Sequence, residues 1–375
     1  MKKTLAALAV LSAFAGSAFA ADVTLYGRLD TGLLFGSTDS DMPNADRVNS
    51  FSMESGTKTG PRWGIKGSEE LGNGLKVGFQ LEGGYNTDDG KMGQSDRIFG
   101  REAQLNISGA FGTLYAGRMN TLASDGGSMA MAGTMSAIGN AFDILSMKSS
   151  TGSTYGRYDN MLGYVSPTFG GVMVAAQYSM KADTKATVEP MKSAGENKAE
   201  ADRYAAFGVQ YAGGPLTVGV LADYSIWGHT ATQDPDNGWT VQAGGNYNCG
   251  FATTFVKLSY FKDMKASGVF EKALWGDDVG GDEHVKGYGA ELGVKVPVGA
   301  GIVFGAVSYR ETKAVDASVD GDWKAKRFGA GVGYQHNLSK RTHVYTAAGY
   351  AQEKGTEDDR TPNRYIATVG MVHMF

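Results

Sequence analysis

Apolar and polar side chains alternate, residue by residue, along most of this chain. Near its start, Leu25, Leu29 and Leu33 occupy one face of the pattern, and Arg28 and Asp30 occupy the other. A period of two residues is that of a β-strand with one apolar and one polar face. The pattern therefore predicts an all-β protein whose strands separate an apolar from a polar environment.

The alternation recurs in sixteen segments, with connections that are short and long in turn. The predicted strands are 22–35, 62–69, 75–86, 98–108, 113–119, 157–164, 172–178, 207–211, 216–224, 239–247, 256–260, 288–296, 303–310, 327–335, 344–350 and 365–375. The long connections lie near 36–60, 87–97, 118–156, 181–202, 228–237, 264–284, 313–324 and 352–362. An even strand count, with short turns on one rim and long loops on the other, is typical of an outer-membrane barrel with periplasmic and extracellular ends.

The apolar faces end repeatedly in aromatic residues, and the chain holds 18 Tyr, 17 Phe and 55 Gly. Aromatic residues gather where the wall of a membrane barrel meets water. A soluble β-sandwich with aromatic cross-strand pairs is the alternative. A helical membrane protein is excluded, because no run of 18 apolar residues follows the N-terminal segment.

The N-terminal segment has the features of a leader sequence. A basic start, a short apolar run and the letters AFA at 18–20 are typical of a secretory signal peptide. We expect the signal peptide at 1–20, with cleavage after Ala20, and the barrel at 21–375. A buried N-terminal helix is the alternative.

The net charge and the cysteine count limit the kinds of partner and of metal site that the chain can have. Loss of Lys2 and Lys3 with the leader takes Lys+Arg from 35 to 33 against 39 Asp+Glu, a net charge of −6. Nucleic acid is therefore not expected as a partner, because phosphate binding needs a basic surface. The single Cys249 cannot form an internal disulfide or a cysteine metal site.

The stretch 118–156 has no period. A loop that long in a compact β protein is functional or marks an error in the assigned elements. We expect it to fold into the barrel and to narrow a water-filled pore. It carries few charges and many Gly, Ala, Ser and Met residues, so it should act mainly by its bulk.

Several motifs resemble those of the general diffusion porins of Gram-negative bacteria, most closely the β-proteobacterial type. They are VTLYGRLD at 23–30, RWGIKGSEELGNGL at 62–75, FGTLYAGR at 111–118, RYDN at 157–160, YVSP at 164–167, NLSKRT at 337–342 and the terminal Phe375. The resemblance spans the whole mature chain. It implies a 16-stranded outer-membrane barrel, usually a homotrimer, that passes ions and small hydrophilic solutes.

The resemblance also implies roles for single residues. The third extracellular loop of such porins forms the constriction, and 118–156 occupies that place. Arg62 and Arg157 match two members of a basic wall cluster that favours anions, whereas Glu102 stands where that pattern has an Arg. The expected charge selectivity is therefore weak, with a preference for anions. The terminal Phe375 resembles the signal read by the outer-membrane assembly machinery. Outer-membrane lipids and lipopolysaccharide are the expected surroundings.

Charges that line a narrow channel of low dielectric constant filter ions by sign. The candidates on the wall are Arg28, Arg62, Lys66, Lys76, Glu102, Arg118 and Arg157, and those on the loop are Asp125 and Asp143. For each residue the alternative is a solvated charge at a rim, without a filtering role.

Arg101 tests the register of its strand. Simple alternation places it with Ala103 and Leu105 on the apolar face. An Arg at mid-membrane on that face costs about 2–4 kcal/mol. We therefore expect Arg101 near the outer rim, or turned inward by a bulge.

An enzyme is not expected, since the five histidines show no catalytic spacing. A substrate-specific channel and an adhesin that acts through the long loops stay open. No cofactor is expected other than Ca²⁺, which carboxylates of the acidic loop clusters at 277–283 and 357–359 could hold.

Overall fold

The computed structural model describes residues 22–146, 151–152, 156–186, 192–229, 234–266, 284–315, 323–355 and 360–375. The signal peptide expected at 1–20 lies outside these residues, as do the acidic clusters at 277–283 and 357–359. Within the described ranges, no helix is long and apolar enough to cross a membrane.

Strands make up nearly all of the regular structure. They are β1 (Thr24–Asp39), β2 (Val48–Ser55), β3 (Arg62–Gly72), β4 (Leu75–Gly84), β5 (Glu102–Gly109), β6 (Gly112–Asn120), β7 (Arg157–Val165), β8 (Val172–Ser179), β9 (Arg203–Gly213), β10 (Leu216–Ile226), β11 (Gly238–Asn248), β12 (Thr253–Lys265), β13 (His284–Val298), β14 (Gly301–Ala314), β15 (Lys324–Asn337), β16 (Thr342–Gly355) and β17 (Asn363–Met374). The short helical elements are α2 (Gly93–Asp96), η1 (Ala132–Met135) and η2 (Asp143–Leu145).

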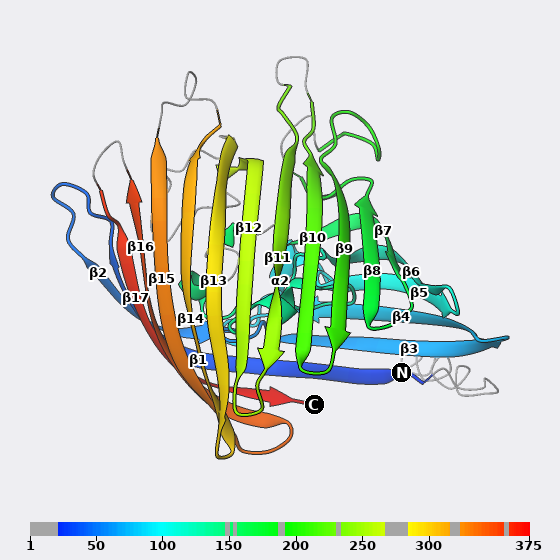
Figure 1. Cartoon of the computed structure of the whole chain (residues 1–375), viewed down its shortest axis with the longest axis horizontal. Coiled ribbons are helices and arrows are strands. Elements are labelled where there is room, and N and C mark those ends of the chain that lie inside the picture. Colours follow the sequence, from blue (N-terminus) through cyan, green and yellow to red (C-terminus); the bar gives the residue numbers. More distant parts are fainter. Residues whose placement is uncertain are drawn as a thin grey trace, which may run out of the picture.

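The strands form one closed antiparallel barrel (Figure 1). Each strand from β3 to β17 pairs with the next, and β17 pairs with β1 to close the ring. Both β2 and β3 pair with β1. Residues 31–38 of β1 pair with β2, and residues 24–28 of β1 pair with β3. They therefore share one position in the wall, and the barrel has the predicted sixteen strand positions.

The predicted unbroken loop over 36–60 is wrong, because β2 lies within it. The alternation of β2 around Phe51 and Met53 is short and is flanked by Ser and Asn, so it gives little signal in the sequence. This segment becomes a strand because it pairs with the edge of β1. The prediction of a strand from residue 98 is also wrong at its start, since β5 begins at Glu102.

The two rims differ as the sequence predicts. The short turns and the C-terminus lie at one rim, and the long connections lie at the other (Figure 1). We call them the short-turn rim and the long-loop rim. On the outer face, large apolar side chains such as Leu105, Leu292 and Val332 are more than half exposed. An exposed apolar band of this kind around a closed barrel is what a lipid environment accommodates.

The last residue closes the barrel against the first strand. Phe375 N donates to Gly27 O at 3.1 Å, and Gly27 N donates to Phe375 O at 3.2 Å. A Cβ atom at position 27 would lie 2.2 Å from the Phe375 ring. The absence of a side chain at Gly27 is therefore what lets the terminal ring pack there.

Gly27→Val is expected to displace the Phe375 ring and to lower the free energy of unfolding by about 1–3 kcal/mol, the usual cost of overpacking. Urea titration followed by tryptophan fluorescence measures this. Gly126→Val is the matched control, since an added Cβ there meets nothing within 4 Å. Equal stability of the two variants would contradict the closure contact.

Candidate functional site

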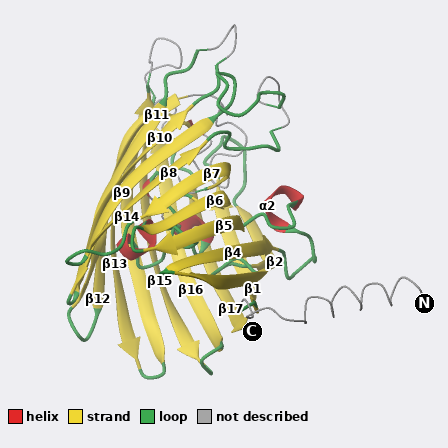
Figure 2. Ribbon diagram, turned by 90° about the vertical axis from the view of Figure 1, so that its right-hand side faces the viewer, coloured by secondary structure: helices red, strands yellow, loops and turns green. Residues whose placement is uncertain are grey.

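The described residues of the stretch between β6 and β7 lie inside the barrel. Its first 3-10 turn, η1, contacts β10, β11 and β12, and its second, η2, contacts β15 and β16. Figure 2 shows both turns enclosed by strands. We call residues 121–156 the inner loop.

The first half of the inner loop packs on the wall through an apolar cluster. Leu122, Met129, Met131 and Met135 from the loop are almost fully buried. Their partners on the wall are Met161, Ala175, Tyr204, Ala206 and Leu221. The many Met residues of this stretch are thus used for packing, which suits their flexible side chains.

The second half of the inner loop is anchored by Phe142. Its ring stacks on Phe304 with 5.3 Å between centroids and meets the edge of Tyr345 at 5.8 Å. Phe142 N also donates to Thr57 O at 2.8 Å. The loop is therefore attached both to the wall and to the segment between β2 and β3.

Glu102 holds the inner loop to the opposite wall. Its carboxylate accepts hydrogen bonds from Ser128 N at 3.1 Å and from Ser128 Oγ at 3.0 Å. Glu102 is only 1% exposed. Glu102, which we expect among the charges of the pore wall, is thus covered by the inner loop.

Three arginines gather on the wall formed by β1, β3 and the start of β5. The Arg28 Nη1 atom donates to Thr59 Oγ1 at 2.7 Å. The Arg62 Nη1 atom lies 3.6 Å from Glu82 Oε1, and Arg101 Nε lies 2.6 Å from the same oxygen. We call Arg28, Arg62 and Arg101 the arginine cluster. With Glu82 its formal charge is 3 − 1 = +2.

Glu82 organises this cluster, and the alternation placed it on the polar face without marking it as a site residue. Besides Arg62 and Arg101, it accepts a hydrogen bond from Tyr26 OH at 3.0 Å. A carboxylate with several charge-assisted hydrogen bonds fixes the side chains around it. Glu82 therefore holds two arginines in place while leaving the cluster with an excess of positive charge.

Arg101 is turned inward, which is the second of the two outcomes predicted for it. The end of a strand, and not a bulge, produces this orientation. Arg101 immediately precedes β5, so strand alternation does not apply to it. Arg101 is 7% exposed, and its side chain is turned inward to Glu82. The cost of an arginine on the lipid face is thus avoided.

Arg157 and Arg118 lie next to this cluster but have different surroundings. Arg157 begins β7 and is close enough to Arg101 for the two charges to act on each other. Arg118 Nη1 lies 2.5 Å from Asp159 Oδ1, a carboxylate that also binds Arg97 at 3.1 Å. Arg118 therefore belongs to an ion-pair network that ties β6, β7 and the connection before β5 together.

Lys66 and Lys76 lie nearer the short-turn rim. The Lys66 Nζ atom lies 5.4 Å from the centroid of the Tyr26 ring. Lys76 pairs with Glu70 at 3.3 Å, and both side chains are well exposed. The structure therefore does not bring Lys76 to the arginine cluster.

The two loop carboxylates also differ. Asp125 is exposed, and it accepts hydrogen bonds from Asn140 N at 2.8 Å and from Asn140 Nδ2 at 3.0 Å. It thus joins the two halves of the inner loop. Asp143 begins η2, and its side chain lies outside the described atoms.

The segment 56–61 contributes groups that the sequence did not suggest. Asp30 accepts hydrogen bonds from Lys58 N, Thr59 N and Tyr345 OH at 3.0, 2.7 and 2.8 Å. The Lys58 Nζ atom lies 2.9 Å from His343 Nε2. The segment had no period to indicate its position, whereas Asp30 was on the polar face of its strand.

Within the described part of the chain, no three His, Cys, Asp or Glu residues are grouped so as to hold a metal ion. The arrangement is instead that of a lumen narrowed from within by a loop, with concentrated positive charge on the wall that carries the arginine cluster.

Comparisons with known proteins agree with this geometry. A family model described as Gram-negative porin matches residues 7–356. The chain is 32% identical to an outer membrane porin protein of Bordetella pertussis over 404 residues, which cover 100% of each chain.

Two solved structures share the fold. An anion-selective porin from Comamonas acidovorans matches 95% of this chain and 100% of its own, with a TM-score of 0.65 and 24% identity. The trimer form of OmpT from Vibrio cholerae matches 95% of this chain and 100% of its own, with a TM-score of 0.58 and 14% identity.

Proposed function

Because the chain belongs to the Gram-negative porin family, and is therefore a diffusion channel of the outer membrane rather than an enzyme, we propose that its lumen passes small anions more readily than small cations. The observation that carries this proposal is the arginine cluster, in which Arg62 and Arg101 share the carboxylate of Glu82 and Arg28 contacts Thr59. The similar porin from Comamonas acidovorans is anion-selective, which agrees with the proposal.

The burial of Glu102 strengthens the expected preference. A carboxylate exposed in the lumen would offset one arginine, but Glu102 is covered by Ser128 and is hydrogen-bonded to it. Charges within a narrow channel concentrate the counter-ion because the low-dielectric wall focuses their field. The ion filter is therefore the excess of positive charge on the wall that carries the arginine cluster, and the inner loop makes the passage beside it narrow.

Planar-bilayer recording of the purified protein under a tenfold KCl gradient tests the proposal. Anion preference makes the high-salt side positive at the reversal potential. The preference should weaken as the mean salt concentration rises, since the screening length falls from about 10 Å at 0.1 M to about 3 Å at 1 M. A reversal potential of the opposite sign would contradict the proposal.

Glu102→Gln is expected to produce two effects that can be separated. Loss of the carboxylate removes a negative charge near Arg157, and we expect the reversal potential to shift toward anions by less than the loss of an exposed carboxylate would produce, because Glu102 is buried. It also weakens the hydrogen bonds to Ser128, which loosens the inner loop and increases current noise. Ser128→Ala is the matched variant, because it weakens the same contact without a change of charge. An equal shift of reversal potential in both variants would show that the Glu102 charge has no influence on the permeating ions.

We also propose that the chain assembles as a homotrimer, as in the trimer form of OmpT. Among the described residues β2 pairs only with β1, and its Phe51 and Met53 are 71% and 56% exposed. An apolar strand with a free edge is a natural contact for another chain. Light scattering with subtraction of the detergent mass should give three protomers, and a single protomer would contradict the proposal.

Two further parts of the proposal concern export of the chain and its insertion into the outer membrane. We propose that the segment 1–20 is removed on export and that Phe375 is read by the outer-membrane assembly machinery. The exposed position of the terminal ring, 46% accessible on Gly27, supports the second role. Detection of Ala21 as the N-terminal residue of the membrane form tests the first.

A further inference from the structure

We propose that the segment 56–61 is a second constriction element of the lumen, and that Lys58 is the positioning residue that holds this segment against the far wall. We call residues 56–61 the strap. The inference presupposes that the lumen conducts and not that it prefers anions. It rests on how the strap leaves the wall, on what the strap joins, and on the tether that Lys58 makes.

The strap leaves the wall of the barrel between β2 and β3. Along β1, the pairing with β2 lies on one side of Asp30 and the pairing with β3 lies on the other. Gly56 has a φ of +73°, and a Cβ atom there would lie 2.7 Å from Pro61 Cδ, so this sharp turn requires glycine. The fully buried Asp30 carboxylate accepts hydrogen bonds from Lys58 N at 3.0 Å and Thr59 N at 2.7 Å. The chain is thus turned off the wall and held at Asp30.

The strap joins the arginine cluster to the inner loop. Thr59 Oγ1 accepts a hydrogen bond from Arg28 Nη1 at 2.7 Å and a longer one from Arg62 Nη2 at 3.4 Å. Two residues earlier, Thr57 O accepts a hydrogen bond from Phe142 N at 2.8 Å. A displaced strap would therefore loosen two arginines on one side and the inner loop on the other. Its position bears on both the width of the passage and the placement of charge beside it.

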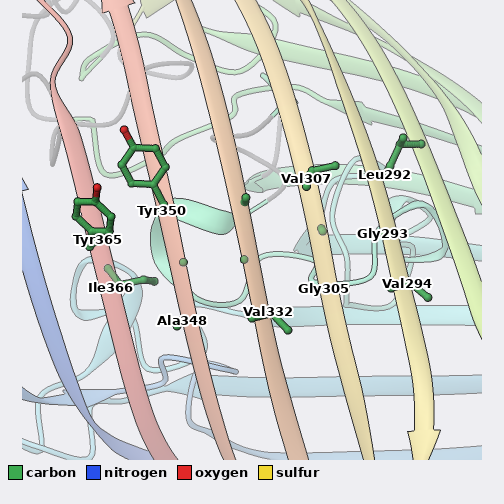
Figure 3. Close-up of a pocket in the computed structure, with 14 residues that line it drawn as sticks. Leu292, Gly293, Val294, Gly305, Val307, Val332, Ala348, Tyr350, Tyr365 and Ile366 are labelled. Atoms are coloured by element: carbon green, nitrogen blue, oxygen red, sulfur yellow. The ribbon is translucent and has the colours of Figure 1, made fainter.

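Lys58 reaches the inner face of β15 and β16. Figure 3 shows the outer face of these strands, where Val332 and Tyr350 line an apolar groove. Gln335 is three residues from Val332, and His343 is seven from Tyr350, so both point into the lumen. The Lys58 Nζ atom donates to Gln335 Oε1 and lies 2.9 Å from His343 Nε2. Because β17 and β1 separate β16 from the strap in the wall, this tether spans part of the lumen.

The tether requires a neutral imidazole at His343. An ammonium group has donors and no acceptor, so His343 Nε2 must accept the hydrogen bond from Lys58. Protonation of His343, which is 9% exposed, would place two positive charges at hydrogen-bond distance and break the tether. The other charged or titratable groups packed around the tether are Arg28, Asp30, Lys295 and Tyr345. Glutamine at position 343 would offer Lys58 an acceptor that does not titrate.

Single-channel recording of Lys58→Met tests the proposal, because methionine fills similar space without the ammonium group. Loss of a hydrogen bond from a charged donor should lower the ratio of time at the parent current to time in larger-current excursions by about 10-fold to 100-fold. Larger neutral solutes should also enter this channel. Heat-dependent migration in gels verifies that the barrel is folded.

Lys295→Met is the matched control. It removes the same charge from a position near Lys58, but the Lys295 Nζ atom lies 5.0 Å from the Phe255 ring centroid and makes no described hydrogen bond to the strap. It should shift the reversal potential without larger-current excursions. Parent-like current in Lys58→Met would overturn the proposal. Equal excursions in both variants would assign the effect to lumen charge and would also overturn it.

The pH profile of His343→Gln tests the acceptor. This variant should match the parent near neutral pH. Excursions should become more frequent in the parent between about pH 7.5 and about pH 4 and stay rare in His343→Gln, since histidine is the group that titrates in the tether. Both proteins keep Asp30, so its titration cancels in the comparison. An equal rise in both would overturn the role of His343. A reversal potential of the cation-preferring sign would contradict the proposed anion preference and leave these outcomes unaffected.

Discussion

Replacing Arg28 and Arg62 by Gln is expected to lower the chloride-to-potassium permeability ratio by roughly threefold to tenfold, because charged clefts concentrate counter-ions by about tenfold or more. The double variant takes the formal charge of the arginine cluster with Glu82 from +2 to 0. Reversal potentials under a KCl gradient measure the change. The Arg101–Glu82 pair is kept, so that no buried carboxylate loses its closest partner.

Lys76→Gln/Lys91→Gln is the matched control for this experiment. It removes the same charge from the protein, but Lys76 is paired with Glu70 and Lys91 with Asp89 at exposed positions away from the cluster. The control should keep the parent reversal potential. A similar shift in both double variants would mean that overall charge, and not the arginine cluster, sets the preference.

Phe142→Ala is expected to loosen the second half of the inner loop and to give a larger, noisier single-channel conductance. The Phe142 ring is 2% exposed between Phe304 and Tyr345, and removing a buried phenylalanine ring costs about 3–5 kcal/mol of packing. Ile138, Ile144 and Leu145 of this half lie in the same buried cluster, so the change weakens the attachment of the loop without removing all of it. The barrel keeps its own hydrogen-bond ladders.

Phe169→Ala provides the comparison for Phe142→Ala. Phe169 is 69% exposed in the turn before β8, and its loss should leave conductance and noise unchanged. Larger neutral solutes should enter the Phe142→Ala channel and be excluded from the parent and from Phe169→Ala. Parent-like exclusion in Phe142→Ala would show that this ring does not hold the constriction.

The strands and their faces could be predicted from the sequence because they follow from a local period of two. Leu25, Leu29 and Leu33 are exposed on the outer face, and Asp30 is buried inside, as the alternation requires. The split of one wall position into β2 and β3 was not predictable in this way. It depends on β1 offering its edge to two segments and on Asp30 binding the residues between them.

The candidate site was predicted in part for the same reason. Arg28 and Arg62 lie on polar faces of regular strands, and their inward direction followed from register. Arg101 lies just outside a strand, where its contact with Glu82 decides its direction. The role of Glu102 depends on Ser128, which lies in a stretch without a period. Residues placed by tertiary contacts of irregular segments leave no signal in the pattern of the sequence.

The central claim is that the inner loop lies in the conducting lumen and narrows it. Gly126→Cys in a Cys249→Ser background tests this most directly, because residue 126 is exposed on the inner loop and has open space for a side chain. Modification by a charged methanethiosulfonate reagent should lower the single-channel current in discrete steps, with a greater loss of anion current for the anionic reagent. Complete modification of Cys at 126, verified by mass, with no change in current would contradict the claim.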